Sequence, residues 1–146
     1  MSAHPMRERG FTLFELLVVI VLVGVATAIL AIGVSKGMQA ASERSALAHM
    51  VASLRSARVQ AIASGKPAQA RFDLAARTAQ APGKKPKAWP DDFVVRLHTA
   101  KDLGAAFEFY PDGAASGGNI LVSRGEKRWR IDIAWLTGSS TLRVLP

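Results

Sequence analysis

Hydrophobic residues are concentrated in one run near the start of the chain. Residues 11–34 are all apolar or small except for two threonines and one carboxylate, Glu15. A helix rises about 1.5 Å per residue, so a run of this length crosses the roughly 30 Å hydrocarbon core of a bilayer. A buried helix of a small globular protein would carry polar residues on its outward face, and residues 16–26 have none. The pattern therefore predicts one transmembrane helix, which we assign to residues 11–36.

A cleaved secretory signal is the main alternative interpretation of this run. Arg7 and Arg9 supply the basic segment that precedes such a signal. However, the apolar stretch is longer than the roughly 7–15 residues typical of a signal, and no convincing A-x-A cleavage site closes it. We therefore expect the helix to remain on the protein.

A second helical pattern follows in residues 37–64. This stretch lacks proline, and its apolar residues recur at spacings of three and four, which is typical of an amphipathic helix. The apolar stripe comprises Leu47, Met50, Val51, Leu54, Ala57, Ala61 and Ile62. We expect it to pack on the protein's own sheet, with Glu43, Arg44, Arg55 and Arg58 largely outside it. Gly65 and Pro67 are the residues expected to end the helix.

Beyond Pro67 the pattern becomes that of short β-strands separated by turns. About seven strands are predicted, at residues 68–74, 77–80, 93–99, 106–110, 120–123, 129–135 and 141–145. Turns are expected at residues 111–113 and 117–119, and a hairpin at residues 124–127. Residues 82–92 are predicted to form a loop, because their three prolines cannot sit in a central strand. The expected fold class is α+β, with one long helix followed by an antiparallel β-rich domain.

Composition excludes several kinds of site. The chain has 146 residues, and only about 100 of them remain to build a soluble domain after the leader and the membrane run, which is enough for one modest domain. It has no cysteine, which excludes disulfides, thiolate nucleophiles and cysteine-ligated metals. His4, His49 and His98 do not have metal-ligand spacing, and residues 112–119 offer too few oxygen ligands for calcium. No phosphate loop or serine nucleophile motif is present. We therefore expect no enzyme activity, no cofactor, no metal and no small-molecule substrate.

The chain is strongly basic. Its formal net charge of +8 favours anionic partners, namely lipid head groups, nucleic acid or acidic proteins, without choosing among them. The candidate contact residues are Lys84, Lys85, Lys87, Arg124, Lys127, Arg128 and Arg130. A solvated surface is the simpler interpretation of the three lysines.

Glu15 is the unusual residue of the membrane run. A carboxylate within a membrane helix costs several kcal/mol unless it reaches water, loses its charge or finds a partner. Its place in the first turn, where the helix dipole favours a negative charge, lowers this cost without removing it. Glu15 is therefore a candidate functional residue, and a snorkelling acid without a partner is the alternative.

The residues around Glu15 resemble a known processing motif. Residues 7–15 read RERGFTLFE, which is similar to the class III leader of type IV pilins and type II secretion pseudopilins. The resemblance implies that a prepilin peptidase cuts between Gly10 and Phe11 on the cytoplasmic side and methylates the new amino group of Phe11. It also implies that Glu15 pairs with the terminal amine of a neighbouring subunit during filament assembly. The proline that many relatives carry within this helix is missing, so any softening would come from Gly24 and Gly33.

Three segments of the C-terminal half extend the resemblance. Residues 107–113 (FEFYPDG), 116–120 (SGGNI) and 131–138 (IDIAWLTG) resemble the H-type minor pseudopilin of type II secretion. This implies a β-sandwich-like domain at residues 65–146, a leader at residues 1–10, and a structural subunit at or near the tip of a periplasmic pseudopilus. The implied location is the inner membrane, with the N-terminus cytoplasmic and the domain periplasmic. The implied partners are other major and minor pseudopilins, the prepilin peptidase and the inner-membrane assembly platform.

A minor pilin of a type IV pilus that captures DNA is the alternative function. The basic residues support it through phosphate contacts. Against it, those residues are scattered and few aromatic residues interleave with them for stacking on bases.

Overall fold

The structure is a computed structural model that describes residues 10–146, so the expected leader lies outside the described residues except for Gly10. The chain divides into two compact units, one reaching Ala40 and the other comprising Ala41–Pro146. A single helix, α1 (Leu13–Ser64, 52 residues), contributes to both units. Each unit is described separately.

The first unit contains the apolar part of α1. Its most hydrophobic 18-residue window has a mean hydropathy of 3.0, and none of it is buried within the protein. In the described part of the chain, α1 is the one helix long and apolar enough to cross a membrane. The Thr27 hydroxyl donates to the Val23 carbonyl at 2.7 Å, so this polar group is satisfied inside the helix. Gly24 and Gly33 lie within α1 without interrupting it.

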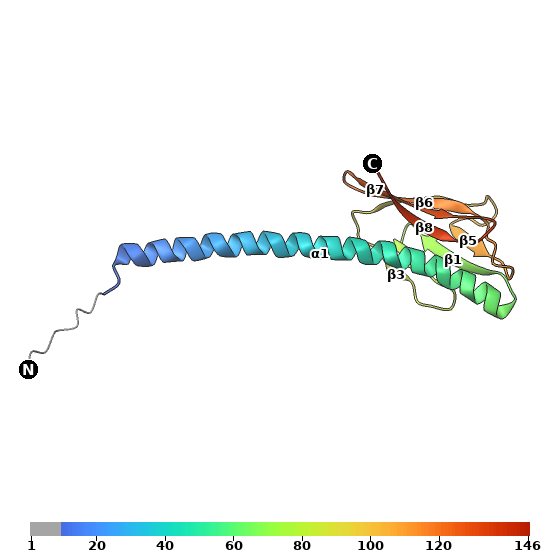
Figure 1. The fold of residues 1–146 in the computed structure, drawn as a ribbon, viewed down its shortest axis with the longest axis horizontal. Helices are drawn as coiled ribbons and strands as arrows, with labels where there is room; N and C mark the ends of the chain where they lie inside the picture. The colour runs from blue at the N-terminus through green and yellow to red at the C-terminus, as the bar shows by residue number, and fades with distance from the viewer. Residues whose placement is uncertain (1–9) are drawn as a thin grey trace, which may run out of the picture. The chain divides into compact units, whose positions relative to one another are not determined.

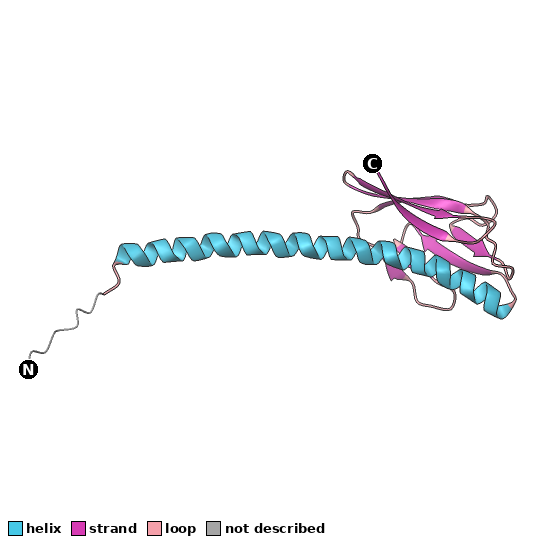
Figure 2. Cartoon of the chain, in the orientation of Figure 1, coloured by secondary structure: helices cyan, strands magenta, loops and turns pink. Residues whose placement is uncertain are grey.

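The second unit contains the rest of α1 and two antiparallel sheets (Figure 2). Its strands are β1 (Ala68–Asp73), β2 (Thr78–Gln80), β3 (Lys87–Ala88), β4 (Val94–His98), β5 (Ala106–Phe109), β6 (Gly118–Arg124), β7 (Lys127–Ile133) and β8 (Ser140–Leu145). Sheet A has the order β3-β2-β1-β5, and sheet B has the order β4-β6-β7-β8. The α+β fold predicted from the sequence is confirmed.

The core of this unit lies between α1 and the inner faces of both sheets (Figure 1). Met50, Leu54 and Ala57 of α1 are at most 1% exposed, because the helix presents its apolar stripe to the sheets. The buried sheet residues include Phe72, Phe107 and Phe109 of sheet A and Ile120, Val122, Trp129 and Ile131 of sheet B. Buried and exposed residues alternate along β7, as expected for a strand with one solvated face.

Most strand predictions are confirmed, including the pairing of the first two strands and the β6–β7 hairpin. The loop predicted at residues 82–92 is wrong in one place, because it contains β3. There, the Trp89 amide donates to the Arg77 carbonyl at 3.0 Å, and the Trp89 ring packs on Phe72 with centroids 6.4 Å apart. These tertiary contacts fix a two-residue strand against β2 despite the nearby prolines.

Two further expectations are corrected. Gly118 and Asn119 belong to β6 rather than to a turn, since Gly118 has no Cβ and the His98 carbonyl occupies the position where a Cβ would lie. Ile62 is 48% exposed and so lies outside the apolar stripe. Near its end, the helix buries Ala61 instead, and Ile62 is turned about 100° away from it.

Arg58 of α1 holds two turns of the β-domain, although the sequence placed it outside the apolar stripe. Its Nε donates to the Gly113 carbonyl at 3.0 Å. Gly138 packs so closely on both groups that an added Cβ would lie 2.1 Å from the Gly113 oxygen and 2.9 Å from Arg58 Nε. The half-buried guanidinium therefore joins the helix to the β5–β6 and β7–β8 connections.

Arg58→Ala is expected to lower the free energy of unfolding by about 1–3 kcal/mol, because the Gly113 carbonyl loses a charged donor. Arg55→Ala, on the exposed face one turn earlier, is the matched control and should change it by less than about 0.5 kcal/mol. Thermal unfolding of the detergent-solubilised protein, followed by circular dichroism, measures both. Equal losses in the two variants would contradict the role given to Arg58.

Candidate functional site

The expected processing junction lies immediately before α1. Gly10 and Phe11 are exposed and lie outside any helix or strand, and α1 begins at Leu13. Phe11 is 76% exposed, and a Cβ added at Gly10 would meet no atom within 4 Å. A peptidase would therefore meet no steric obstacle from the rest of the described chain at this bond.

Thr12 caps the start of α1. Its hydroxyl oxygen accepts a hydrogen bond from the Glu15 amide at 3.2 Å, which satisfies one of the free donors of the first turn. Threonine followed three residues later by glutamate is also the sequence of a capping box. Glu15 therefore has two candidate roles, one in capping its own helix and one in pairing with another subunit.

The Glu15 side chain is exposed in the first turn of α1. Within residues 10–146 its carboxylate forms no ion pair. A carboxylate at this position of a membrane helix is costly without a counter-charge. If the charge is to be balanced, the partner must come from outside the described chain.

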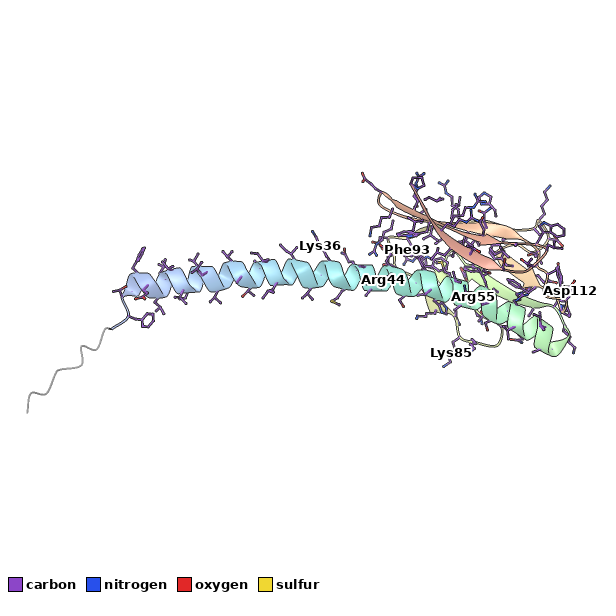
Figure 3. The ribbon with its side chains drawn as sticks, viewed as in Figure 1. Lys36, Arg44, Arg55, Lys85, Phe93 and Asp112 are labelled. Carbon is purple, nitrogen blue, oxygen red and sulfur yellow. The ribbon has the colours of Figure 1, made fainter. Side chains whose placement is uncertain are left out.

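The structure brings Arg124 and Lys127 together around Glu43, at the β6–β7 turn. Glu43 has a side chain only 12% exposed, and it lies 3.6 Å from Arg124 Nη1 and 3.3 Å from Lys127 Nζ. Arg124 also donates from Nε to Asp92 Oδ2 at 2.6 Å and lies over the Phe93 ring, 5.6 Å from its centroid. Phe93, labelled in Figure 3, stacks on Trp129 at 6.1 Å. We call these residues the Glu43 cluster.

The other two candidate arginines of β7 are also engaged within the chain. Arg130 Nε donates to Asp132 Oδ1 at 2.6 Å, and Arg128 donates to the Pro146 carbonyl. Both arginines are exposed on β7. The β6–β7 hairpin is therefore a surface of mixed charges.

The three candidate lysines lie elsewhere, on sheet A and the connection that leads to it. Lys84 and Lys85 lie between β2 and β3, Lys87 opens β3, and all three are exposed. Lys85 extends from its loop into solvent in Figure 3. Among the described residues none of the three forms an ion pair. The two basic groups belong to different sheets and do not form one site.

Sequence reasoning missed three features of this surface. Glu43 and Arg58 are charged residues of α1 that bind groups of the β-domain, and those partners lie far from them in the sequence. Trp135 and Leu136, whose turn follows β7, are 68% and 67% exposed, whereas the pattern placed Trp135 in a strand. The turn is nevertheless ordered by a hydrogen bond of 2.8 Å from the Ala115 amide to the Trp135 carbonyl. Only the adjacent Thr137 and Gly138 offered a signal that the strand ends early.

Across residues 10–146, no three His, Asp or Glu side chains gather closely enough to hold a metal ion. His49 lies in α1 and approaches the Ala79 carbonyl at 3.2 Å, which is a structural contact between helix and sheet.

Comparison with known proteins gives two family matches within the one chain. The model of the prokaryotic N-terminal methylation motif matches residues 5–34, and that of type II transport protein GspH matches residues 46–138. The chain is 36% identical over 135 residues to type II secretion system protein H of Xanthomonas campestris, covering 89% of this chain and 80% of the relative. The minor pseudopilin EpsH of the Vibrio cholerae type 2 secretion system has a similar fold, with a TM-score of 0.51 at 14% identity. That match covers 71% of this chain and 95% of EpsH.

Glu43→Gln is expected to lower the free energy of unfolding by about 1–3 kcal/mol, because Arg124, with only 16% of its side chain exposed, loses one of its two carboxylate partners. Lys127→Ala should cost less than about 1 kcal/mol, since that side chain is 63% exposed and its ion pair is screened by water. The same unfolding measurement ranks the two variants. A larger loss for Lys127→Ala would show that the Glu43 cluster is wrongly described.

Proposed function

The chain belongs to the type II transport protein GspH family, and on that premise we propose that it acts as a minor pseudopilin at or near the tip of the periplasmic pseudopilus. Its role is that of a structural subunit of the type II protein secretion system, and it catalyses no reaction. The supporting observation is that a methylation-motif match and a GspH match occupy residues 5–34 and 46–138 of a chain whose α1 runs unbroken between them.

The proposed maturation begins at the junction before α1. A prepilin peptidase cuts between Gly10 and Phe11 on the cytoplasmic side and methylates the amine of Phe11. The exposure of both residues and their position outside the helix support access to this bond. Residues 1–10 would then be the leader, residues 11–36 the single membrane span, residues 37–64 the amphipathic helix, and residues 65–146 the periplasmic domain.

The apolar part of α1 suits an anchor that later enters a filament. Before assembly its side chains are covered by lipid, and in the filament they are covered by the helices of other subunits. Both environments are apolar, so the transfer exchanges one apolar contact for another. The inner membrane, the assembly platform and the other major and minor pseudopilins are the surroundings proposed for these steps.

In our proposal, Glu15 fixes the position of α1 relative to the helix of the neighbouring subunit. Its carboxylate pairs with the amine of Phe11 on a neighbouring subunit, and each charge offsets the desolvation cost of the other. The lack of an ion pair for Glu15 within residues 10–146 leaves the carboxylate open to such a partner. A one-residue slip would leave both charges unpaired in an apolar surrounding, which is why the pair selects one position.

The alternative, a DNA-capturing minor pilin, is less consistent with the surface. Arg124, Lys127 and Arg130 are paired with carboxylates of the same chain, so phosphate contacts would have to displace those ion pairs. Phe93 and Trp129, which accompany them, are buried and offer no stacking surface. Among the candidate residues, Lys84, Lys85, Lys87 and Arg128 form no ion pair with an Asp or Glu of the described chain.

The two candidate roles of Glu15 make opposite predictions for a pair of substitutions. Glutamine also serves in a capping box, so a capping role predicts that Glu15→Gln assembles normally and that Thr12→Ala does not. Intersubunit pairing predicts the reverse, and we expect Glu15→Gln to reduce incorporation into pseudopili by about tenfold or more, since a charged pair is lost in an apolar surrounding. The quantity to measure is the ratio of sheared filament to membrane-bound protein.

N-terminal analysis of the purified protein is the control for this comparison. Both variants should begin at methylated Phe11, which shows that processing at Gly10 is intact. Normal incorporation of Glu15→Gln would overturn the pairing role.

Deleting the gene in frame in the source bacterium tests the function itself. We expect extracellular enzyme activity to fall while DNA uptake and surface motility continue, with secretion restored by a plasmid copy. Loss of uptake or motility with normal secretion would instead assign the protein to a type IV pilus.

A further inference from the structure

The outer face of sheet A is hollowed into a trough with polar side chains at its centre. Two adjoining concavities of about 620 and 600 Å³ share Gln69 and Arg71 of β1 and Gln80 of β2. The register aligns Arg71 with Gln80 on one side, and Gln69 with Glu108 of β5 on the other. We call this surface the sheet A trough.

The walls of the trough are fixed by hydrogen bonds. On one side, the turn at residues 81–84 is closed by the Lys84 amide donating to the Ala81 carbonyl at 3.1 Å, and Gln80 Nε2 donates to the Lys84 carbonyl at 2.8 Å. On the other side, the Phe72 amide donates to the Ala105 carbonyl at 2.8 Å, which holds the segment carrying Leu103 against β1. The trough is therefore already formed in the isolated chain.

Charges in the trough follow a definite order. Arg71 lies at its centre, is exposed, and forms no ion pair within residues 10–146. Glu108 lies beside it, but one of its carboxylate oxygens accepts a hydrogen bond from Gln69 Nε2 at 2.8 Å. Lys84 and Lys85 extend the positive charge beyond one wall, and Asp73 lies two residues from Arg71 toward the opposite end.

This order suits a polypeptide better than a polyanion. Residues on one face of a strand repeat every 6.6–6.8 Å or so, which is also the repeat of an extended partner segment. Arginine binds carboxylates through two parallel hydrogen bonds, and glutamine side chains bind peptide groups. A nucleic acid would bring phosphates against Asp73 and Glu108 and would find no stacking surface, since Phe72, the one aromatic residue of the lining, is 2% exposed.

We propose that the sheet A trough binds an extended segment of a neighbouring pseudopilin that carries side chains of both charges, which places a carboxylate on Arg71 and a basic side chain near Asp73. Lys84 and Lys85 attract the same segment from a distance. The inference rests on the proposed function, because it requires a filament neighbour. Arg71 would be the specificity-determining residue of this contact.

A photo-crosslinking amino acid placed at Lys84 of the full-length protein, expressed in the source bacterium, tests the proposal. We expect an adduct with another pilin-like subunit, identified by mass spectrometry. Arg71→Glu should reduce its yield about tenfold or more, because the carboxylate would meet a like charge. Asp73→Asn, which keeps the oxygen that accepts the Ala76 amide at 2.8 Å, should reduce it less.

The matched control is Arg96→Glu, the same charge reversal on exposed β4 of sheet B, which should leave the Lys84 adduct unchanged. Arg71→Gln serves if Arg71→Glu accumulates poorly, and protease resistance checks the fold of each variant. An adduct that persists at full yield in both Arg71 variants would overturn the proposal. An adduct with nucleic acid would also overturn it, and so would the absence of any protein adduct in cells that secrete normally. The last result would leave the proposed function standing, since secretion is scored separately.

Discussion

The packing of one helical stripe against two sheets is the constraint on which the β-domain depends. Neither four-stranded sheet can cover its own inner face, and Met50, Leu54 and Ala57 of α1 fill the space between them with almost no exposed surface. Burying such side chains supplies most of the favourable free energy of a small domain, roughly 1.5–3 kcal/mol for each large one. Because the same helix begins in the membrane-competent unit, the element that completes the domain's core is also the continuation of its anchor.

Local patterns in the sequence were sufficient to predict the structure wherever one repeat of apolar residues determined it. The amphipathic stripe is a helical repeat, and residues 93–97 and 129–133 alternate as strands do, so their buried faces could be predicted. The processing junction at Gly10 and Phe11 came from the family resemblance of residues 7–15, and it stays a prediction together with the role of Glu15. Predicting these features does not require knowing which residues distant in the sequence lie beside them.

Contacts between residues that are far apart in the sequence could not be predicted in this way. Arg58 meets a carbonyl 55 positions away, and Lys127 meets Glu43 across 84 positions, so a charged residue beside an apolar stripe gave no sign of being docked. Strand β3 exists because Trp89 packs on Phe72, and this tertiary contact outweighed the local effect of the prolines. The sheet A trough draws its lining from α1, three strands and the connections between them, and none of those segments carries a motif by itself.

Two of the polar contacts that α1 makes with the β-domain, those of Glu43 and Arg58, resist sliding of the helix along its axis. Glu43 and Arg58 are fifteen positions apart, which is about 22 Å along a helix, and the side chains between them on the buried face are almost all apolar. Apolar residues recurring every three or four positions would still fit if the helix slid by one turn, whereas an ion pair and a charged hydrogen bond would both be broken. A pull on the helix along its axis therefore loads both contacts at once, in shear, instead of detaching the stripe one residue at a time. Such an arrangement suits the assembly step proposed above, in which the anchor leaves the lipid bilayer while the attached domain stays folded.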